Sequence, residues 1–156
     1  AYKDNSPIVS ATDRCNMVKL AIKPFDYMSL STIETDRPGN TYTADTLAQI
    51  YDSYKKIYFI IGADSLLYIQ DWYHPEYICS HCHLLCANRD NNSASVLIDQ
   101  KHFLADKYGA VIDFIDVPKL PYSSTDIRKK VAMGLSVKED VGEEVEEYIK
   151  SRKLYV

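Results

Sequence analysis

Residues 123–128, Ser-Ser-Thr-Asp-Ile-Arg, combine the side chains that can bind a phosphate group. Ser123 and Asp126 have the spacing of a capping box, which predicts the start of a helix. The first N–H groups of a helix attract anions, and Arg128 would add a guanidinium beside them. Without a bound anion, Arg128 and the two lysines after it would oppose the helix dipole. We therefore expect a phosphate site here, with an ordinary helix cap and solvated basic residues as the alternative.

Gly62 and Asp64 follow an apolar run, Ile57–Ile61, and could contact a nucleotide. A glycine directly after a buried strand lets a ligand approach the backbone closely. Asp64 would stand at the start of a helix, where its carboxylate could accept a hydrogen bond from a ribose hydroxyl. A simple capped turn from strand to helix explains the same residues equally well.

Two segments with aromatic residues could hold a planar anionic ligand. Tyr42 and Thr43 lie where a helix is predicted to begin, and N–H groups there could bind a carboxylate. Trp72 and Tyr73 lie in a polar, turn-like stretch, where the indole could form a shelf for a ligand ring. The alternatives are a simple helix cap at Thr43 and a tryptophan that belongs to the core.

Cys79, Cys82 and Cys86, with His81 and His83 between them, have a spacing that could bind a metal. A Cys-x-x-Cys pair often supplies two zinc ligands, and the other two usually come from a second pair elsewhere. The sequence has no second pair, and the apolar pattern from residue 83 predicts a buried strand with alternating side chains. We expect no metal site and reduced, partly buried cysteines in a cytoplasmic protein, with a small zinc-binding module as the alternative.

The composition is that of one folded domain of 156 residues. Hydrophobic residues make up 46% and charged residues 26%, which excludes a disordered or collagen-like chain. The apolar runs are too short to cross a bilayer, and a net charge of −4 argues against a nucleic-acid partner. We expect a single domain over residues 1–156 with small-molecule ligands and neither a nucleic-acid nor a membrane partner. Homo-oligomer formation stays open.

The apolar pattern predicts strands that alternate with helices. The predicted helices run from Thr12 or Asp13 to Ile22, then Thr43–Tyr54, a short helix after Asp64, Pro75–Ser80, Ser95–Tyr108, Ser124–Met133 and Asp140–Ser151. The predicted strands are Tyr27–Glu34, Lys56–Ile61, His83–Asn88 and Ala110–Ile115, and Arg37–Asn40 is a predicted turn. Such an order is typical of an α/β protein with a mostly parallel sheet flanked by helices. Ligands bind at the carboxyl ends of such strands, so the polar clusters should follow the strands.

Taken in order, the four clusters resemble the bacterial nicotinate-nucleotide adenylyltransferases, a branch of the nucleotidyltransferase superfamily. Four motifs carry the resemblance: Thr41-Tyr-Thr-Ala-Asp-Thr46 is similar to the family's S-Y-T-x-D-T, Phe59–Asp64 to F-I-I-G-A-D, Trp72-Tyr73 to W-Y, and Ser123–Arg128 to S-S-T-x-I-R. The resemblance covers essentially the whole chain and implies a Rossmann-like nucleotidyltransferase fold. It also implies the reaction in NAD biosynthesis that transfers AMP from ATP to nicotinate mononucleotide, giving nicotinate adenine dinucleotide and pyrophosphate.

The resemblance also implies roles for individual residues. Trp72 would stack on the pyridine ring, and Tyr42, Thr43 and Tyr73 would complete the acceptor site, with backbone N–H groups on the carboxylate. The residues implied for ATP are Gly62, Asp64, Arg89, Ser123, Ser124, Thr125, Ile127 and Arg128, of which Ser124 and Arg128 would act in catalysis. Lys3 would face a substrate phosphate. Mg²⁺ would be the cofactor, carried by the triphosphate with few or no protein ligands.

The sequence departs from the family in one respect. The family begins with a strand and the motif G-x-F-D-P-x-H-x-G-H, whose two histidines bind the ATP phosphates, and no segment of this chain resembles it. The resemblance therefore implies that the first βαβ unit is missing, that residues 123–156 form the C-terminal helical part, and that these 156 residues alone are incomplete for catalysis. Open alternatives are another acceptor, nicotinamide mononucleotide or phosphopantetheine, and a non-catalytic nucleotide-binding fragment.

Overall fold

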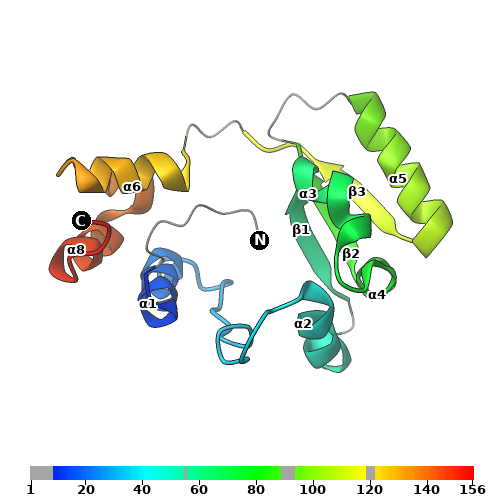
Figure 1. Ribbon diagram of the computed structural model, residues 1–156, viewed down its shortest axis with the longest axis horizontal. Coiled ribbons are helices and arrows are strands. Elements are labelled where there is room, and N and C mark those ends of the chain that lie inside the picture. Colours follow the sequence, from blue (N-terminus) through cyan, green and yellow to red (C-terminus); the bar gives the residue numbers. More distant parts are fainter. Residues whose placement is uncertain (1–8, 55, 89–93, 119–121) are drawn as a thin grey trace. The chain divides into compact units, whose positions relative to one another are not determined.

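The computed structural model describes residues 9–54, 56–88, 94–118 and 122–156 (Figure 1). The chain forms two compact units. Unit 2 is continuous in sequence, Arg37–Lys119, whereas unit 1 combines Ala1–Asp36 with Leu120–Val156. Among the described residues, all the strands belong to unit 2, and none of the helices is long and apolar enough to cross a membrane.

A parallel three-stranded sheet forms the centre of unit 2. Strands β1 (Tyr58–Gly62), β2 (His83–Ala87) and β3 (Val111–Ile115) lie side by side in the order β1-β2-β3. Their register pairs Gly62 with Ala87 and Ala87 with Ile115, so the three strands end at the same edge. The expectation of a mostly parallel sheet is confirmed, with small shifts at the strand ends.

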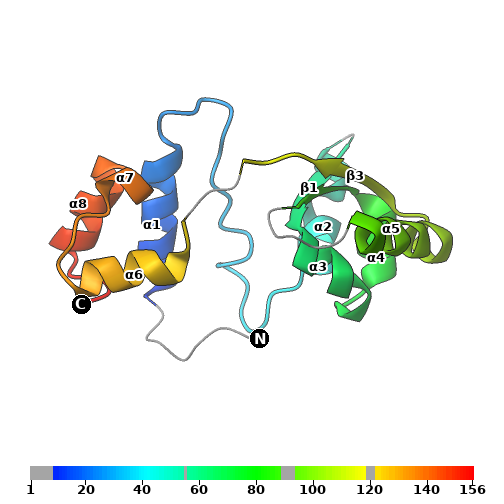
Figure 2. The same ribbon diagram turned by 90° about the horizontal axis from the view of Figure 1, so that it is seen from above.

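Helices cover the sheet face that buries its side chains. They are α2 (Thr43–Ile50), α3 (Ala63–Tyr68), α4 (Pro75–His81) and α5 (Ala94–Tyr108), with short 3-10 turns η1 (Tyr51–Ser53) after α2 and η2 (Ile69–Asp71) after α3. Figure 2 shows α3, α4 and α5 on one side of the sheet. Right-handed crossovers between consecutive parallel strands place their connecting helices on one face, which explains this arrangement.

The core of unit 2 lies between the sheet and these helices. Its largest fully buried side chains are Leu66, Ile69, Ile78, Leu84, Leu104 and Ile112. Burying one such side chain stabilises a fold by roughly 1.5–3 kcal/mol. The core thereby fixes the positions at which the strands end and the next helices begin.

Unit 1 joins segments from the two ends of the chain. Its helices are α1 (Ala11–Ile22), α6 (Ser124–Ala132), α7 (Lys138–Val141) and α8 (Glu143–Ser151), and α1 packs against α8. The buried carboxylate of Asp13 accepts hydrogen bonds from Ser10 Oγ (2.6 Å), Tyr148 Oη (2.8 Å) and Arg152 Nε (3.2 Å). These bonds, with that from Ser10 the largest contribution, lower the pKa of Asp13. The carboxylate therefore stays ionised and links α1 to α8.

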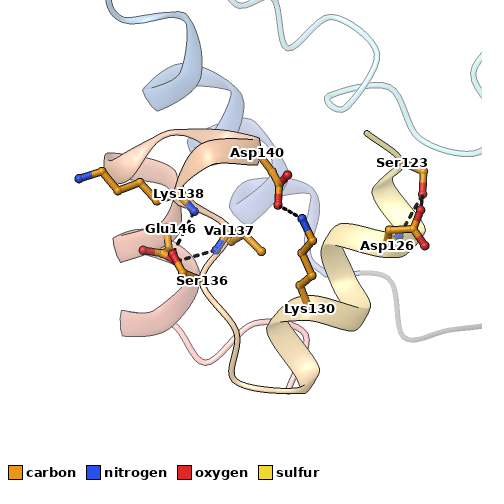
Figure 3. A network of polar contacts seen from close by, with 8 residues as sticks. All are labelled: Ser123, Asp126, Lys130, Ser136, Val137, Lys138, Asp140 and Glu146. Atoms are coloured by element: carbon orange, nitrogen blue, oxygen red, sulfur yellow. Dashed lines mark hydrogen bonds and ion pairs between the residues drawn. The ribbon is translucent and has the colours of Figure 1, made fainter. Parts of the chain in front are cut away.

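Glu146 on α8 holds the loop that joins α6 to α7. Its buried carboxylate accepts hydrogen bonds from Ser136 Oγ and from the Val137 N–H, both at 2.7 Å (Figure 3). Lys150 Nζ lies 2.9 Å from the other carboxylate oxygen. These partners, Ser136 foremost, lower the pKa of Glu146 to about 2. The loop after α6 is thus fixed to α8 by an ionised side chain.

One predicted strand is wrong. Residues 27–34 are described, and they form turns and irregular backbone without strand pairing. Backbone N–H groups bond locally instead, that of Met28 to the Phe25 carbonyl (3.1 Å) and that of Asp36 to the Thr32 carbonyl (2.9 Å). Ser31 and Thr35 add side-chain bonds to nearby backbone groups, which compete with sheet formation.

Apart from shifts of one residue, helix ends differ from expectation at three places. Ser10, rather than Thr12 or Asp13, caps α1, because its side chain accepts the Asp13 N–H. The helix predicted over Thr43–Tyr54 ends at Ile50 and continues as η1. The helix predicted over Asp140–Ser151 is divided at Gly142, whose φ of +86° is outside the helical region.

Candidate active site

The N-terminus of α2 carries Tyr42 and Thr43. Tyr42 is the N-cap with extended backbone (φ −122°, ψ 140°), and its side chain makes no capping hydrogen bond. Thr43 is the first helical residue, so its N–H is one of those that a helix leaves without an intrahelical partner. The first turn of α2 therefore presents N–H groups at the positive end of the helix dipole, where a carboxylate could bind.

Tyr73 lies against this helix N-terminus. The ring centroids of Tyr42 and Tyr73 are 4.5 Å apart, and the ring planes are inclined by 35°. The ring of His74 contacts Tyr73 edge-on, with 4.2 Å between centroids. Two segments that the sequence predicted separately for the acceptor site are thus in contact.

Trp72 is anchored to the core of unit 2 and is only partly buried. Its ring meets that of Phe59 edge-on, with centroids 6.3 Å apart and planes at 68°. The backbone N–H of Trp72 donates to the Ile69 carbonyl (3.1 Å) at the end of η2. This backbone N–H is therefore not available to a ligand. Core packing therefore fixes the indole, and its exposed part could still contact a ligand ring.

Gly62 ends β1 and is the N-cap of α3, without a side chain to cap the helix. Its φ of −79° is open to any residue, and a Cβ built there would meet no atom within 4 Å. The protein itself therefore does not require glycine at this position, whereas a ligand close to the backbone would. Asp64 is exposed in the first turn of α3, where the helix dipole favours a carboxylate.

Ser123 caps α6 as the sequence predicts. Its Oγ accepts the Asp126 N–H (3.0 Å) and donates to Asp126 Oδ2 (2.6 Å), as Figure 3 shows. Ser124 and Thr125 are exposed at the start of the helix. Arg128 is partly buried, and its Nη2 donates to Thr125 Oγ1 (3.3 Å). Hydroxyl groups, first-turn N–H groups and a guanidinium therefore lie on adjoining turns of one helix.

Arg128, the fifth residue of α6, lies past the first turn, so the helix dipole opposes its charge only weakly. Because α6 ends at Ala132, Lys129 and Lys130 lie in its last turn, where the helix dipole favours cations. Lys130 Nζ moreover pairs with Asp140 Oδ2 (2.6 Å) on α7. The expectation that these two lysines oppose the dipole is wrong, because both lie beyond the first turn of the helix.

The predicted site residues are divided between the two units. Tyr42, Thr43, Gly62, Asp64, Trp72 and Tyr73 belong to unit 2, and Ser123, Ser124, Thr125, Ile127 and Arg128 belong to unit 1. Lys3 and Arg89 lie outside the described residues. The shared role of these residues in one reaction stays a prediction.

The three clustered cysteines are free thiols in the core of unit 2. Desolvation raises the pKa of Cys79 to about 11 and that of Cys82 to about 12, and it raises the pKa of Cys86. Cys82 Sγ donates to the Ile78 carbonyl at 3.1 Å. In the part of the chain that the structure describes, no group of three or more His, Cys, Asp or Glu side chains could hold a metal ion.

Sequence reasoning missed Arg37, whose side chain lies against α2. Its Nη2 is 3.5 Å from Thr46 Oγ1, while its Nε and Nη1 are closed off from solvent and have no hydrogen-bond partner among the described residues. A lone arginine in a turn gives no sequence signal for such burial, which depends on the packing of distant residues.

The fold and these clusters define the class of protein. A parallel sheet whose strands are followed by helices and polar clusters is a Rossmann-like α/β fold, which binds ligands at the carboxyl ends of its strands. The chain belongs to the cytidylyltransferase-like family, which it matches over residues 1–130.

Curated relatives are similar over nearly the whole chain. The probable nicotinate-nucleotide adenylyltransferase of Lachnoclostridium phytofermentans is 35% identical over 158 residues, which cover 100% of this chain and 79% of the relative. That of Caldicellulosiruptor bescii is 35% identical, covering 95% and 75%. That of Moorella thermoacetica is 36% identical, covering 99% and 72%.

Solved structures agree on the fold. The nicotinic acid mononucleotide adenylyltransferase of Plasmodium falciparum, complexed with APC, matches 96% of this chain and 78% of its own with a TM-score of 0.72. The same enzyme complexed with NaAD matches 98% and 78%, also with a TM-score of 0.72. Both are 18% identical to this chain.

Proposed function

We propose that this chain is a nicotinate-nucleotide adenylyltransferase, which transfers AMP from ATP to nicotinate mononucleotide and releases pyrophosphate. The single observation that carries the proposal is the contact between Tyr42 and Tyr73 at the uncapped N-terminus of α2. Relatives at 35–36% identity that carry this name support it. The reaction makes the chain an enzyme of NAD biosynthesis.

The acceptor side would recognise a pyridine ring and its carboxylate. The N–H groups of Thr43 and Tyr73 would bind the carboxylate, since the first turn of α2 favours an anion. Trp72 would stack on the ring from its fixed place against Phe59. Tyr42 would hold Tyr73 in place through the contact between the two rings.

Most of the residues proposed for ATP come from the motifs at the end of β1 and at the start of α6. Gly62 would let the nucleotide approach the end of β1, and Asp64 would accept a hydrogen bond from the ribose. The residues proposed to frame the adenine and the phosphates are Arg89, Ser123, Ser124, Thr125 and Ile127. Arg128 would neutralise charge that develops on the phosphates, while Lys3 would face a substrate phosphate.

The chemistry requires positioning more than a covalent nucleophile. A phosphate oxygen of nicotinate mononucleotide attacks the α-phosphorus of ATP, and the bond from that phosphorus to the bridging oxygen breaks. The electron pair of that bond leaves with pyrophosphate. Binding both nucleotides in line replaces a bimolecular encounter, and Arg128 with the N–H groups of α6 would stabilise the added charge.

Magnesium would enter the reaction as part of the substrate, Mg·ATP. Phosphate oxygens would supply most of its ligands, with few or none from the protein. Mg²⁺ supplies charge neutralisation on the triphosphate, and the residues of this chain bind the phosphate groups around it.

The test is pyrophosphate release from Mg·ATP by the purified protein, with any residues that precede Ala1 in its source retained. Nicotinate mononucleotide, nicotinamide mononucleotide and phosphopantetheine are offered in parallel, and a reaction without acceptor is the control. We expect release with nicotinate mononucleotide and at most slow release with the other two. Release only with phosphopantetheine, or with no acceptor, would contradict the proposal.

A further inference from the structure

The guanidinium of Arg37 lacks hydrogen-bond partners for two of its nitrogens among the described residues. Its Nε and Nη1 are closed off from solvent without a hydrogen-bond partner, and its Nη2 reaches only Thr46 Oγ1 at 3.5 Å. None of the ion pairs found in the described part of the chain includes Arg37. A buried polar group without partners, and a charged one above all, destabilises a fold.

The turn before α2 places this guanidinium beside the first turn of the helix. Gly39 has φ +85°, the conformation that a turn with proline and glycine at its centre requires. Thr46, which Arg37 contacts, donates its hydroxyl to the Tyr42 carbonyl (3.3 Å). The guanidinium therefore lies about one helical turn from the uncapped N-terminus of α2.

This position adds a positive charge to an already positive end of the helix. The dipole of α2 makes its N-terminus attractive to anions, and the charge of Arg37 acts in the same direction. Asp45, in the same turn, lines a cavity of about 540 Å³ beside His74 and forms no ion pair with Arg37 in the described residues. The unpaired guanidinium of Arg37 costs stability when no anion is bound. An anion bound at the first turn of α2 would offset that cost.

We propose that Arg37 is a positioning residue that gives the acceptor site its preference for a carboxylate over a carboxamide. The proposal rests on the proposed function and deepens it. Because Nε and Nη1 are closed off from solvent, Arg37 acts through the potential at the first turn of α2 and not by touching the substrate. A unit charge several ångströms away in a partly buried site changes the binding of an anion by about tenfold, and it leaves a neutral amide nearly unaffected.

The test compares Arg37→Met with wild type on nicotinate mononucleotide and nicotinamide mononucleotide at saturating Mg·ATP, and on varied Mg·ATP at saturating nicotinate mononucleotide. We expect Arg37→Met to raise KM for the nicotinate form by about tenfold and to leave KM for the amide and for ATP unchanged. Arg37→Lys keeps the charge and should keep most of the preference. Lys56→Met removes an exposed charge of the same unit just before β1, at the opposite end of that strand from Gly62, and is the matched control, expected to match wild type.

Thermal unfolding separates this role from a structural one. Arg37→Met removes a buried unpaired charge, so we expect its Tm to equal or exceed that of wild type. Nicotinate mononucleotide should then raise Tm less in Arg37→Met than in wild type. A lower Tm together with equal losses on both acceptors and ATP would show a structural role only and overturn the inference.

The two proposals fail in different ways. If wild type prefers the nicotinate form and Arg37→Met keeps that full preference, the inference about Arg37 is wrong and the proposed function stands. If wild type turns over neither pyridine nucleotide, the proposed function is wrong, and the role of Arg37 falls with it.

Discussion

Lys130 Nζ on α6 lies 2.6 Å from Asp140 Oδ2 on α7, and the Asp140 side chain is only 5% exposed. This ion pair ties the helix that carries Ser124 and Arg128 to the rest of unit 1. A second set of polar contacts, centred on Glu146, fixes the loop between the same two helices. The position of the proposed phosphate-binding helix is therefore set by residues that the phosphate would not touch.

Breaking this ion pair on one side should destabilise unit 1. Lys130→Met leaves a nearly buried carboxylate without its partner, and we expect a loss of about 1–2 kcal/mol, since Lys130 itself is half-exposed. The double variant Lys130→Met/Asp140→Leu removes both charges and should recover most of the loss. Urea unfolding of both variants measures the effect, and equal losses in the two would contradict the explanation.

Arg128→Ala should impair catalysis more than folding. Removing one charged donor from a site of phosphoryl transfer lowers kcat by about a hundredfold, and KM for ATP should also rise. Lys129→Ala, an exposed neighbour on the same helix, is the control and should retain near wild-type rates. Steady-state pyrophosphate release gives both constants. Equal effects of the two variants would argue against a role of Arg128 at the phosphates.

Tyr42→Ala should weaken acceptor binding selectively. Losing the ring contact with Tyr73 costs about 1 kcal/mol, which corresponds to a rise of about fivefold in KM for nicotinate mononucleotide. KM for ATP should not change. Tyr54→Ala, which removes an exposed tyrosine of the same unit, serves as control. An effect of Tyr42→Ala on ATP alone would place the ring in a different site.

Acid should weaken unit 1 through Glu146. Hydrogen bonds in the folded chain lower the pKa of this carboxyl from 4.5 to about 2. Such a group stabilises the fold fully above its unfolded-state pKa and loses that effect as pH falls toward the folded value. We therefore expect Tm to drop between about pH 4.5 and pH 2, and less steeply in Glu146→Gln. Glu147→Gln, at an exposed site on α8, should follow the wild-type curve.

The cysteines should differ in reactivity. Burial raises the pKa of Cys79 to about 11 and of Cys82 to about 12, which keeps them as thiols, and Cys86 is fully buried. Cys15 is only partly buried. A disulfide reagent at pH 8 should react promptly with one thiol of the native protein and with the other three after unfolding. Cys15→Ser should abolish the prompt phase; a prompt phase that remains would contradict the assignment.

Much of unit 2 could be predicted because local pattern and tertiary structure agree there. The run Ile57–Ile61 ends at Gly62 and forms β1, as such a run predicts, but the expected burial is wrong: Ile61 is buried, whereas Tyr58 and Ile60 are exposed. Apolar and polar residues also alternate over residues 27–34, but a strand needs a neighbouring strand to pair with. A local sequence pattern does not specify that neighbour. The break at Gly142 had a visible signal, since a glycine inside a helix costs about 1 kcal/mol.

In the candidate site, too, local motifs could be predicted from the sequence and tertiary contacts could not. Tyr42, Trp72 and Tyr73 could be selected from their motifs, and the contact of Tyr42 with Tyr73 agrees with that selection. Arg37 could not, because only the packed structure reveals that its Nε and Nη1 lack partners. Lys130 was assigned the wrong electrostatic role, because its ion pair with Asp140 is a contact between two helices that the sequence pattern does not specify.

The bond between Tyr148 and Asp13 spans 135 positions, and it has a consequence for synthesis. A chain made from its N-terminus exposes α1 to water long before α8 exists. Unit 2, which is continuous, has all its residues by Lys119 and can fold while the ribosome is still at work. Unit 1 cannot form until α8 has been synthesised. During most of translation α1 therefore lacks α8, the helix against which it packs.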